Sequence, residues 1–321
     1  LPFLKDNSIV NYLKIRGSYG LVGSDGFGGN HFVYFDTISI DGGGTFWMGP
    51  NKSGGTSYQS HAVSGYAIQN ATWERVKKLN LGVDFTLFRN LSGSVEYFKD
   101  KRDRIMLQRA SWPLIMGYWN ATPWGQVGEA ESHGFEASLN WDKQINKDLQ
   151  ISFRGNFSYN QNKYIYKDEP DYNSVWQRQT GMPLDGYRTE GLFESEEEIA
   201  NSPDQLLGTA VRPGDIKYRD VNGDGRVDGD DRALISPYGR TPRIQYGLGA
   251  NLRWKNWDLG VFFNGSAKRT IIAGNVETFG TDDRNVMQWV ADNAWTMENP
   301  NPNAKYPRLG LTAADNANNM E

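Results

Sequence analysis

The chain of 321 residues carries 34 lysines and arginines against 38 aspartates and glutamates, so its net charge of −4 offers no basic surface for nucleic acid. It has no cysteine, which excludes a disulfide scaffold. Its mean hydropathy of −0.64 is typical of a soluble protein. A membrane β-barrel hardly raises this value, because only alternate strand residues face lipid.

Seven segments alternate between apolar and polar residues, as strands do when one face of a sheet is apolar. In the second segment, Leu79, Leu81 and Val83 share one face, while Asn80 and Asp84 share the other. The predicted strands are, in chain order, 13–19, 79–87, 91–98, 135–142, 149–160, 244–254 and 257–265.

The connections between these strands alternate in length. Short turns at 88–90, 143–148 and 255–256 join strands into pairs, and tens of residues separate the pairs. Outer-membrane barrels have short periplasmic turns and long extracellular loops, with aromatic residues at both ends of the strands. The sequence therefore predicts an all-β protein that is part of an antiparallel transmembrane β-barrel with long extracellular loops. A soluble antiparallel sandwich also alternates, but it would bury the apolar faces against a second sheet.

Residues 220–231 read Asp-Val-Asn-Gly-Asp-Gly-Arg-Val-Asp-Gly-Asp-Asp, which resembles an EF-hand calcium loop. Gly225 stands at the sixth position, where such a loop turns sharply. The predicted calcium ligands are Asp220, Asn222, Asp224, the carbonyl of Arg226, Asp228 and Asp231. Position twelve is Asp in place of the usual Glu, so we expect modest affinity and a structural role. The alternative is a polar turn that binds no ion.

No group of serine, cysteine, histidine or carboxylate residues has the spacing of a catalytic site, so we expect no enzyme activity. Glu196, Glu197 and Glu198 follow Ser195, and this order predicts a short helix with Ser195 as its N-cap.

The long connections are rich in aromatic residues. Rings in an exposed polar loop pack on one another or contact a ligand or partner, and indole rings suit the flat C–H faces of sugars. The candidate ligand or lid contacts are Trp47, Trp112, Trp119, Trp124 and Trp176. Packing among the loops is the alternative for each ring.

A set of motifs over nearly the whole chain is specific in combination. They are Tyr12-Leu-Lys-Ile-Arg-Gly-Ser-Tyr-Gly20, Ala71-Thr-Trp-Glu74, Lys78-Leu-Asn-Leu-Gly82, Glu96-Tyr-Phe-Lys-Asp-Lys-Arg102, Gly186 to Ser195 with Glu197-Glu-Ile199, Pro213-Gly-Asp-Ile-Lys-Tyr218, Ala294-Trp-Thr-Met-Glu-Asn-Pro-Asn301 and Tyr306-Pro-Arg-Leu309. Together with the loop at 220–231, they resemble the SusC/RagA family of TonB-dependent transporters.

The resemblance implies that residues 1–321 are a segment of a barrel of about 22 strands in the cell outer membrane. The plug domain and the final strands would be absent from this segment, and the loop at 220–231 would belong to an extracellular loop. The implied partners are a SusD-like surface lipoprotein, TonB acting through the missing plug, outer-membrane lipid and an imported substrate.

Family members import oligosaccharides most often and peptides in some cases, and the loop aromatics favour a glycan here. Two further hypotheses remain open at this point. One is a secreted glycan-binding β-domain with a dockerin-like calcium loop. The other is a barrel enzyme, which would need a nucleophile and base that we do not find.

Overall fold

The structure is a computed structural model that describes residues 7–25, 32–48, 56–68, 70–116, 121–170, 184–271, 285–312 and 314–319. The chain divides into two compact units. The first consists of Leu1–Asn173, Gln179–Met182 and Pro242–Lys268, and the second of Ser174–Arg178, Pro183–Thr241 and Arg269–Glu321. Each unit is described by itself.

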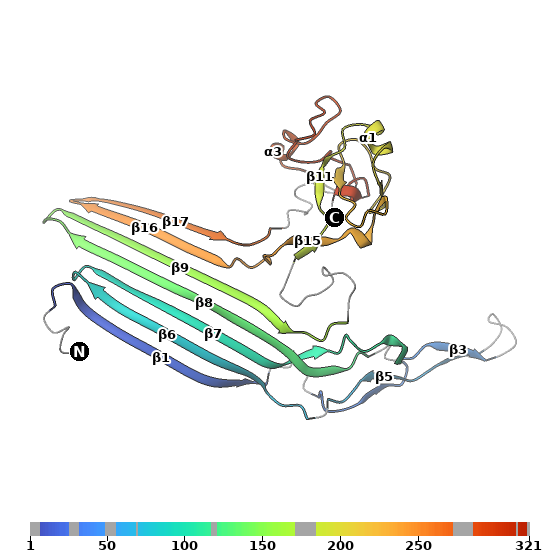
Figure 1. Cartoon of the computed structure of the whole chain (residues 1–321), viewed down its shortest axis with the longest axis horizontal. Coiled ribbons are helices and arrows are strands. Elements are labelled where there is room, and N and C mark those ends of the chain that lie inside the picture. The colour runs from blue at the N-terminus through green and yellow to red at the C-terminus, as the bar shows by residue number, and fades with distance from the viewer. Residues whose placement is uncertain are drawn as a thin grey trace. The chain divides into compact units, whose positions relative to one another are not determined.

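The first unit is built on an antiparallel sheet of seven strands in the order β1-β6-β7-β8-β9-β16-β17 (Figure 1). Its strands are β1 (Val10–Ser24), β6 (Glu74–Leu87), β7 (Leu91–Gln108), β8 (Trp124–Gln144), β9 (Leu149–Tyr166), β16 (Ile244–Trp254) and β17 (Trp257–Ala267). Each long strand pairs with the next long strand of the chain. All seven predicted strands are confirmed.

The register keeps the predicted faces together across the whole sheet, and a slip of one residue in any strand would reverse its face. One apolar row consists of Ile15, Val83, Val95, Ala137, Phe157, Tyr246 and Gly265. A polar row on the other face consists of Lys14, Asp84, Ser94, Ser138, Asn156, Gly247 and Asn264.

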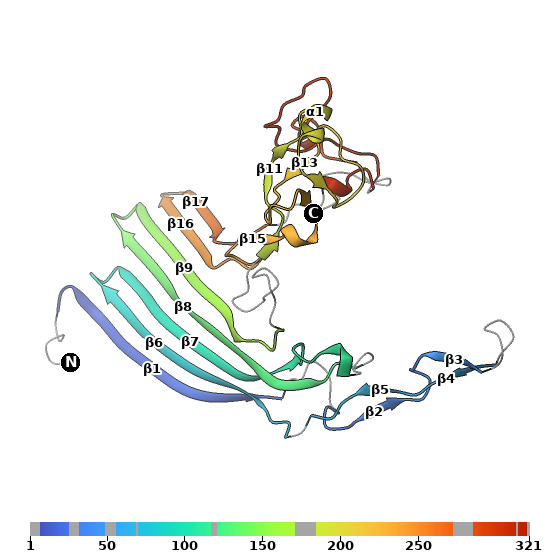
Figure 2. The same ribbon diagram turned by 45° about the vertical axis from the view of Figure 1, so that its right-hand side comes forward.

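The apolar face is open in this unit. Ile15 is 75% exposed and Leu248 is 57% exposed, although both are large apolar side chains at the centre of their strands. The unit is a single curved layer in the described residues (Figure 2). The sandwich alternative, which required a second sheet over this face, is wrong.

Several strands continue beyond their predicted ends on the side of the long connections. The extensions are held by ion pairs between neighbouring strands, such as Lys99 Nζ to Glu131 Oε2 at 3.1 Å and Lys101 Nζ to Glu129 Oε2 at 3.3 Å. Their residues are charged on both faces, so they show no apolar alternation. The sheet therefore extends, with polar residues on both faces, past its apolar belt, which is the band of apolar residues on one face of the seven predicted strand segments.

The three short turns lie at one end of the sheet, and the long connections leave from the other end (Figure 1). Phe88, Arg89 and Lys255 have positive φ angles of 52°, 62° and 52° in these turns. The first long connection carries a narrow hairpin arm. Its strands are β2 (Thr37–Ser39), paired with β5 (Ala62–Gly65), and β3 (Thr45–Met48), paired with β4 (Thr56–Gln59).

The second unit contains three sheets of two strands each among its described residues. Its strands are β10 (Leu184–Gly186), β11 (Thr189–Leu192), β12 (Asp204–Gln205), β13 (Ile216–Tyr218), β14 (Arg226–Val227) and β15 (Ala233–Ser236). Its short helices are α1 (Glu196–Ala200), η4 (Gly229–Asp231), α3 (Gln288–Ala291) and η5 (Ala317–Asn319). Among the described residues of the first unit, η2 (Leu114–Met116) is a short helix. As predicted, Ser195 caps α1 and its Oγ accepts from the Glu198 N–H at 3.2 Å.

The second unit has a core of its own, which the sequence analysis did not anticipate. Its buried apolar residues are Phe193, Tyr218, Val227, Val290, Ala294 and Trp295. Asp215 is also buried, and its carboxylate lies 2.6 Å from Arg308 Nε and accepts from Asn319 Nδ2 at 2.9 Å. The core therefore joins the motif at 213–218 to the motifs at 294–301 and 306–309.

None of the helices among the described residues has the length and apolar character needed to span a membrane.

Candidate functional site

A cavity of about 870 Å³ lies where the long connections meet β7 and β8. Arg104 comes from β7, Arg109 directly follows β7, and Trp124 begins β8. Its aromatic, guanidinium and amide side chains are those of Tyr66, Arg104, Arg109, Trp112, Trp124 and Gln126. The cavity thus combines three aromatic rings with two guanidinium groups and one amide.

A buried carboxylate orders one wall of this cavity. Arg109 Nε donates to Asp168 Oδ2 at 2.7 Å, and Ser111 Oγ donates to Asp168 Oδ1 at 2.8 Å. The Arg109 guanidinium carbon also lies 5.2 Å from the centroid of the Trp112 ring. Asp168, which follows β9, therefore fixes the connection after β7 and, through Arg109, the position of Trp112.

The pKa of Asp168 reflects this environment. Burial by itself would raise the pKa, because the side chain is only 4% exposed. The hydrogen bonds from Ser111 and Arg109 and the charge of Arg109 outweigh burial, so the pKa lies below its usual value. The Asp168–Arg109 contact is therefore an ion pair at neutral pH.

A second group of contacts joins Thr72, Arg104 and Gln126, which also line the cavity. Gln126 Oε1 accepts from the Thr72 N–H at 2.7 Å, and Gln126 Nε2 donates to the Thr72 carbonyl in return. Arg104 Nη1 donates to Thr72 Oγ1 at 3.3 Å. These bonds tie the chain entering β6 to the start of β8, so they hold the backbone at a second place along the cavity.

Two of the five predicted aromatic contacts lie in this cavity. Trp112 and Trp124 line it together. Trp47 is exposed on β3 of the hairpin arm, opposite Ser57, and does not line it. Trp119 and Trp176 lie outside the described residues.

Sequence reasoning missed the polar members of the site, namely Tyr66, Arg104, Arg109, Gln126 and the supporting Asp168. One signal was available for Arg109, since it stands three residues before Trp112 at the end of a strand. Nothing in the sequence links it to Asp168.

The polar face of the sheet carries a charged network across β1, β6 and β7. Arg16 Nη1 donates to Glu96 Oε2 at 2.7 Å, and Arg16 Nη2 donates to Asp84 Oδ1 at 3.1 Å. Asn80 Nδ2 donates to Glu96. One guanidinium thus bridges two carboxylates from neighbouring strands, which is an arrangement suited to a water-filled lumen and costly in lipid.

In the predicted calcium loop, the carboxylates accept hydrogen bonds from the loop's own backbone. Asp220 Oδ2 accepts from the Gly225 N–H at 2.9 Å and Oδ1 accepts from the Gly223 N–H at 2.6 Å, and these bonds hold the pKa of Asp220 below its usual value. Asp231 is buried and accepts from Val221 and Asp228.

In the same loop, Asn222, Asp224 and Asp228 each accept from the backbone N–H two residues later, and Asn222 and Asp224 are exposed. Among the described residues, no three histidine, cysteine, aspartate or glutamate side chains gather into a group able to hold a metal ion. The donor set is right for a hard cation, and each carboxylate oxygen with one N–H bond keeps a free lone pair. Calcium binding stays a prediction.

Comparison with known proteins places the sheet in a family. Residues 9–298 match the family described as TonB dependent receptor-like, beta-barrel. The chain belongs to this TonB-dependent receptor β-barrel family. Its apolar face is therefore the lipid-facing surface of an outer-membrane barrel, and its polar face, with Arg16, Asp84 and Glu96, lines the lumen.

Relatives of this TonB-dependent receptor segment confirm the SusC/RagA resemblance. TonB-dependent receptor P3 of Formosa agariphila is 27% identical over 330 residues, covering 96% of this chain and 30% of that protein. TonB-dependent receptor SusC of Bacteroides thetaiotaomicron is 24% identical over 262 residues, covering 80% of this chain and 25% of SusC. The chain thus spans about a third or less of these relatives.

Solved structures agree on the fold. The RagAB peptide importer in its open-open state matches with a TM-score of 0.64 and 17% identity, covering 98% of this chain and 32% of that chain. Its closed-closed state matches with a TM-score of 0.63 and 18% identity, covering 98% and 33%. At these identities the match shows the arrangement of the TonB-dependent receptor segment and nothing finer.

Proposed function

We propose that the protein to which this segment belongs imports oligosaccharides across the outer membrane, in a TonB-dependent manner, as the barrel of a SusCD-type complex. Membership of the TonB-dependent receptor family and the relationship to SusC support transport. In this proposal a SusD-like lipoprotein covers the barrel, and TonB acts through a plug domain.

The observation that carries the substrate class is the cavity at the loop end of the sheet. Trp112 and Trp124 supply flat apolar faces, and Arg104, Arg109 and Gln126 supply hydrogen-bond donors beside them. A sugar presents both features, a C–H face and a ring of hydroxyls. The Asp168 and Thr72 contacts hold these groups in place before a ligand arrives, which lowers the entropy cost of binding.

The test uses the complete transporter with its lipoprotein partner and a panel of fluorescent oligosaccharides and peptides of similar size. Each stacked ring contributes on the order of 1 kcal/mol, so we expect Trp112→Ala with Trp124→Ala to weaken oligosaccharide binding about 10- to 30-fold. Trp47→Ala, which changes an exposed ring outside the cavity, is the matched control and should bind as the wild type does.

Uptake should stop when the proton gradient is dissipated, because TonB draws on that gradient. TonB-dependent uptake of peptides without uptake of any oligosaccharide would show that the transporter is a peptide importer. Equal binding by the double variant and the Trp47→Ala control would remove the cavity from the proposal.

We also propose that residues 220–231 bind calcium in a structural role. The donor set at Asp220, Asn222, Asp224, the Arg226 carbonyl, Asp228 and Asp231 supports this, as does the turn at Gly225, which has a φ of 85°.

A further inference from the structure

The lipid-facing surface of the sheet is not uniform. A groove of about 350 Å³ runs over β8, β9, β16 and β17, within the apolar belt. Its walls are the apolar side chains of Leu139, Trp141, Phe153, Leu248, Val261 and Phe263. The groove lies on the lipid-facing surface, so a hydrocarbon chain is what meets it.

The groove exists because one position of the belt has no side chain. Gly155 pairs with Leu139 on one side and with Leu248 on the other, so it lies at the floor. A Cβ on Gly155 would stand 3.4 Å from Leu248 Cδ2, which is an ordinary contact, and the backbone there needs no left-handed conformation. Packing within the sheet therefore leaves room for a larger residue at this position, and the space is open to a ligand.

Basic residues stand at the end of the sheet where the short turns lie. Lys143 is opposite Ile151 at the end of the apolar face, and Lys255 is in the turn between β16 and β17. The two turns are joined, since the Lys255 N–H donates to the Asp148 carbonyl at 2.8 Å.

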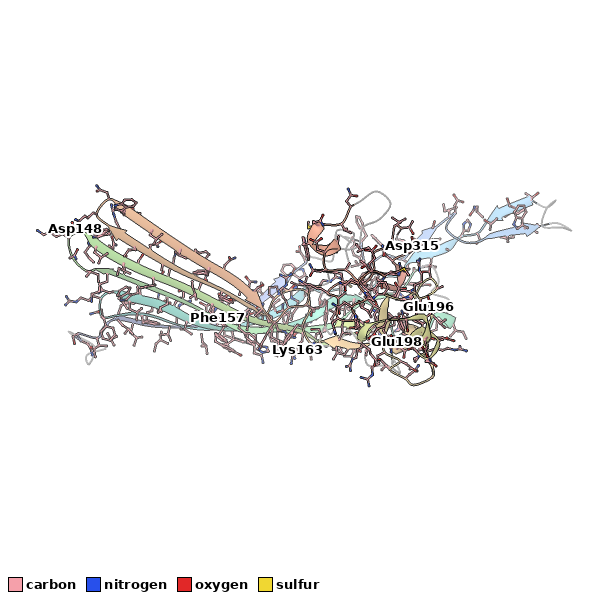
Figure 3. The ribbon with its side chains drawn as sticks, turned by 90° about the horizontal axis from the view of Figure 1, so that it is seen from above. Asp148, Phe157, Lys163, Glu196, Glu198 and Asp315 are labelled. Carbon is pink, nitrogen blue, oxygen red and sulfur yellow. The ribbon has the colours of Figure 1, made fainter. Side chains whose placement is uncertain are left out.

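The charge of this end is positive on balance. Lys147 belongs to the same pair of turns, and Asp148, labelled in Figure 3, is their one acidic residue. Asp142 and Asp258 lie nearby on strand positions of the lumen-facing parity. Within the part of the chain that the structure describes, neither Lys143 nor Lys255 forms an ion pair. This end of the lipid-facing surface is therefore free to bind an anion.

The depth of the groove identifies the leaflet. Short turns face the periplasm in outer-membrane barrels. Ala250 and Leu248 line the groove four and six residues from Trp254, which is the last residue before the turn. With a rise of about 3.4 Å per residue and a tilt of about 45°, they lie about 10 and 14 Å below that turn. Half of the hydrocarbon core is about 15 Å, so the groove spans the periplasmic leaflet.

We propose that this groove and the adjacent lysines form a binding site for one anionic phospholipid of the periplasmic leaflet. One acyl chain lies in the groove over Gly155, and the phosphate head group contacts Lys143 and Lys255. The ring of Trp254, whose centroid is 5.6 Å from Lys255 Nζ, stands at the level between head group and chain.

The test is native mass spectrometry of the complete transporter, released from detergent after incubation with phosphatidylglycerol or phosphatidylcholine. The wild type should retain one phosphatidylglycerol and release phosphatidylcholine. Gly155→Leu, which fills the groove, should lower retention of phosphatidylglycerol at least 10-fold. Gly17→Leu is the matched control, because a Cβ on Gly17 would also stand 3.4 Å from a leucine Cδ2, that of Leu81, at a lipid-facing position outside the groove.

A second variant tests the head group and does not touch the apolar belt. Lys143→Gln with Lys255→Gln should weaken phosphatidylglycerol retention about 10- to 30-fold and leave phosphatidylcholine unchanged. These lysines are exposed, so this variant gives an answer even where Gly155→Leu fails to assemble. Equal retention by Gly155→Leu and Gly17→Leu, no preference between the two lipids, or retention of lipopolysaccharide in place of phospholipid would each overturn the proposal.

Discussion

Asp168 orders the connection after β7 although it lies far away in the chain. Its carboxylate binds both Arg109 and Ser111, and its burial leaves no water to replace them. A charged hydrogen bond of this kind contributes about 1.5–3 kcal/mol. The aromatic side of the cavity therefore depends on one residue that does not itself line the cavity.

We expect Asp168→Asn to open this connection. Protection from hydrogen exchange in the peptide that contains Arg109 to Met116 should fall about 10- to 100-fold at pH 7, because the ion pair is lost. Because the folded-state pKa of Asp168 lies below the unfolded value of about 3.9, its contribution is present above that value and disappears as the pH falls through the folded pKa. The wild type should therefore approach the variant only in acid, and equal protection at pH 7 would contradict the role assigned to Asp168.

Neighbouring residues of one strand have different surroundings, because one faces lipid and the next faces the hydrated lumen. Val95 belongs to the apolar row and Ser94 to the polar row, where its Oγ lies 2.8 Å from Ser138 Oγ. A lysine costs about 2–4 kcal/mol at the middle of the lipid-facing surface and much less in a hydrated lumen.

We therefore expect Val95→Lys to reduce the amount of assembled transporter in the outer membrane several-fold, while Ser94→Lys loses only one hydrogen bond and assembles. Heat-modifiable migration on a gel measures the assembled fraction. Better assembly of Val95→Lys than of Ser94→Lys would mean that the face carrying Ser94, and not the face carrying Val95, contacts lipid.

The predicted calcium loop can be tested with two of its own aspartates. Asp231 is buried and accepts three backbone N–H groups, so Asp231→Ala should lower the thermal unfolding temperature even in EDTA. Asp224 is exposed, so Asp224→Ala should matter only when calcium is present. If calcium does not raise the unfolding temperature of the wild type above its value in EDTA, the loop is a polar turn without an ion.

The strands could be predicted because lipid on one side and water on the other impose a period of two on the sequence. Their outer ends could not, because ion pairs such as Lys99 with Glu131 hold a ladder that has charge on both faces. Of the cavity, the sequence predicted only the aromatic residues Trp112 and Trp124. The polar residues Arg109 and Gln126 could not be predicted, because they are held by Asp168 and Thr72, which are far from them in the sequence and meet them only in the folded sheet.

At the scale of the whole molecule, the two units have separate sources of stability. The sheet depends on lipid and on strand pairing, and the second unit depends on a buried core around Asp215 and Trp295. Gly214 has a φ of 87° there, and a Cβ on it would collide with the Trp295 ring and stand 2.9 Å from Arg308 Cβ. The core is therefore packed so tightly against Gly214 that no side chain fits there.

Gly214→Ala should therefore destabilise the second unit by at least about 1–3 kcal/mol and leave the sheet unchanged. Hydrogen exchange of the complete transporter, compared peptide by peptide, separates the two. Gly223→Ala is the control, because it has a similar φ of 77° and nothing within 4 Å of the added Cβ. Equal loss of protection in both units would mean that they unfold as one.

The pairing of β9 with β16 has a consequence for how the chain assembles. The other neighbouring strands of the sheet are connected by a hairpin turn or a single loop. The pairing of β9 with β16 instead closes the long segment between Tyr166 and Ile244. Closing a long flexible segment costs entropy that grows with its length. Most of that segment belongs to the second unit, so folding of that unit shortens the free chain and couples to the pairing of β16 with β9.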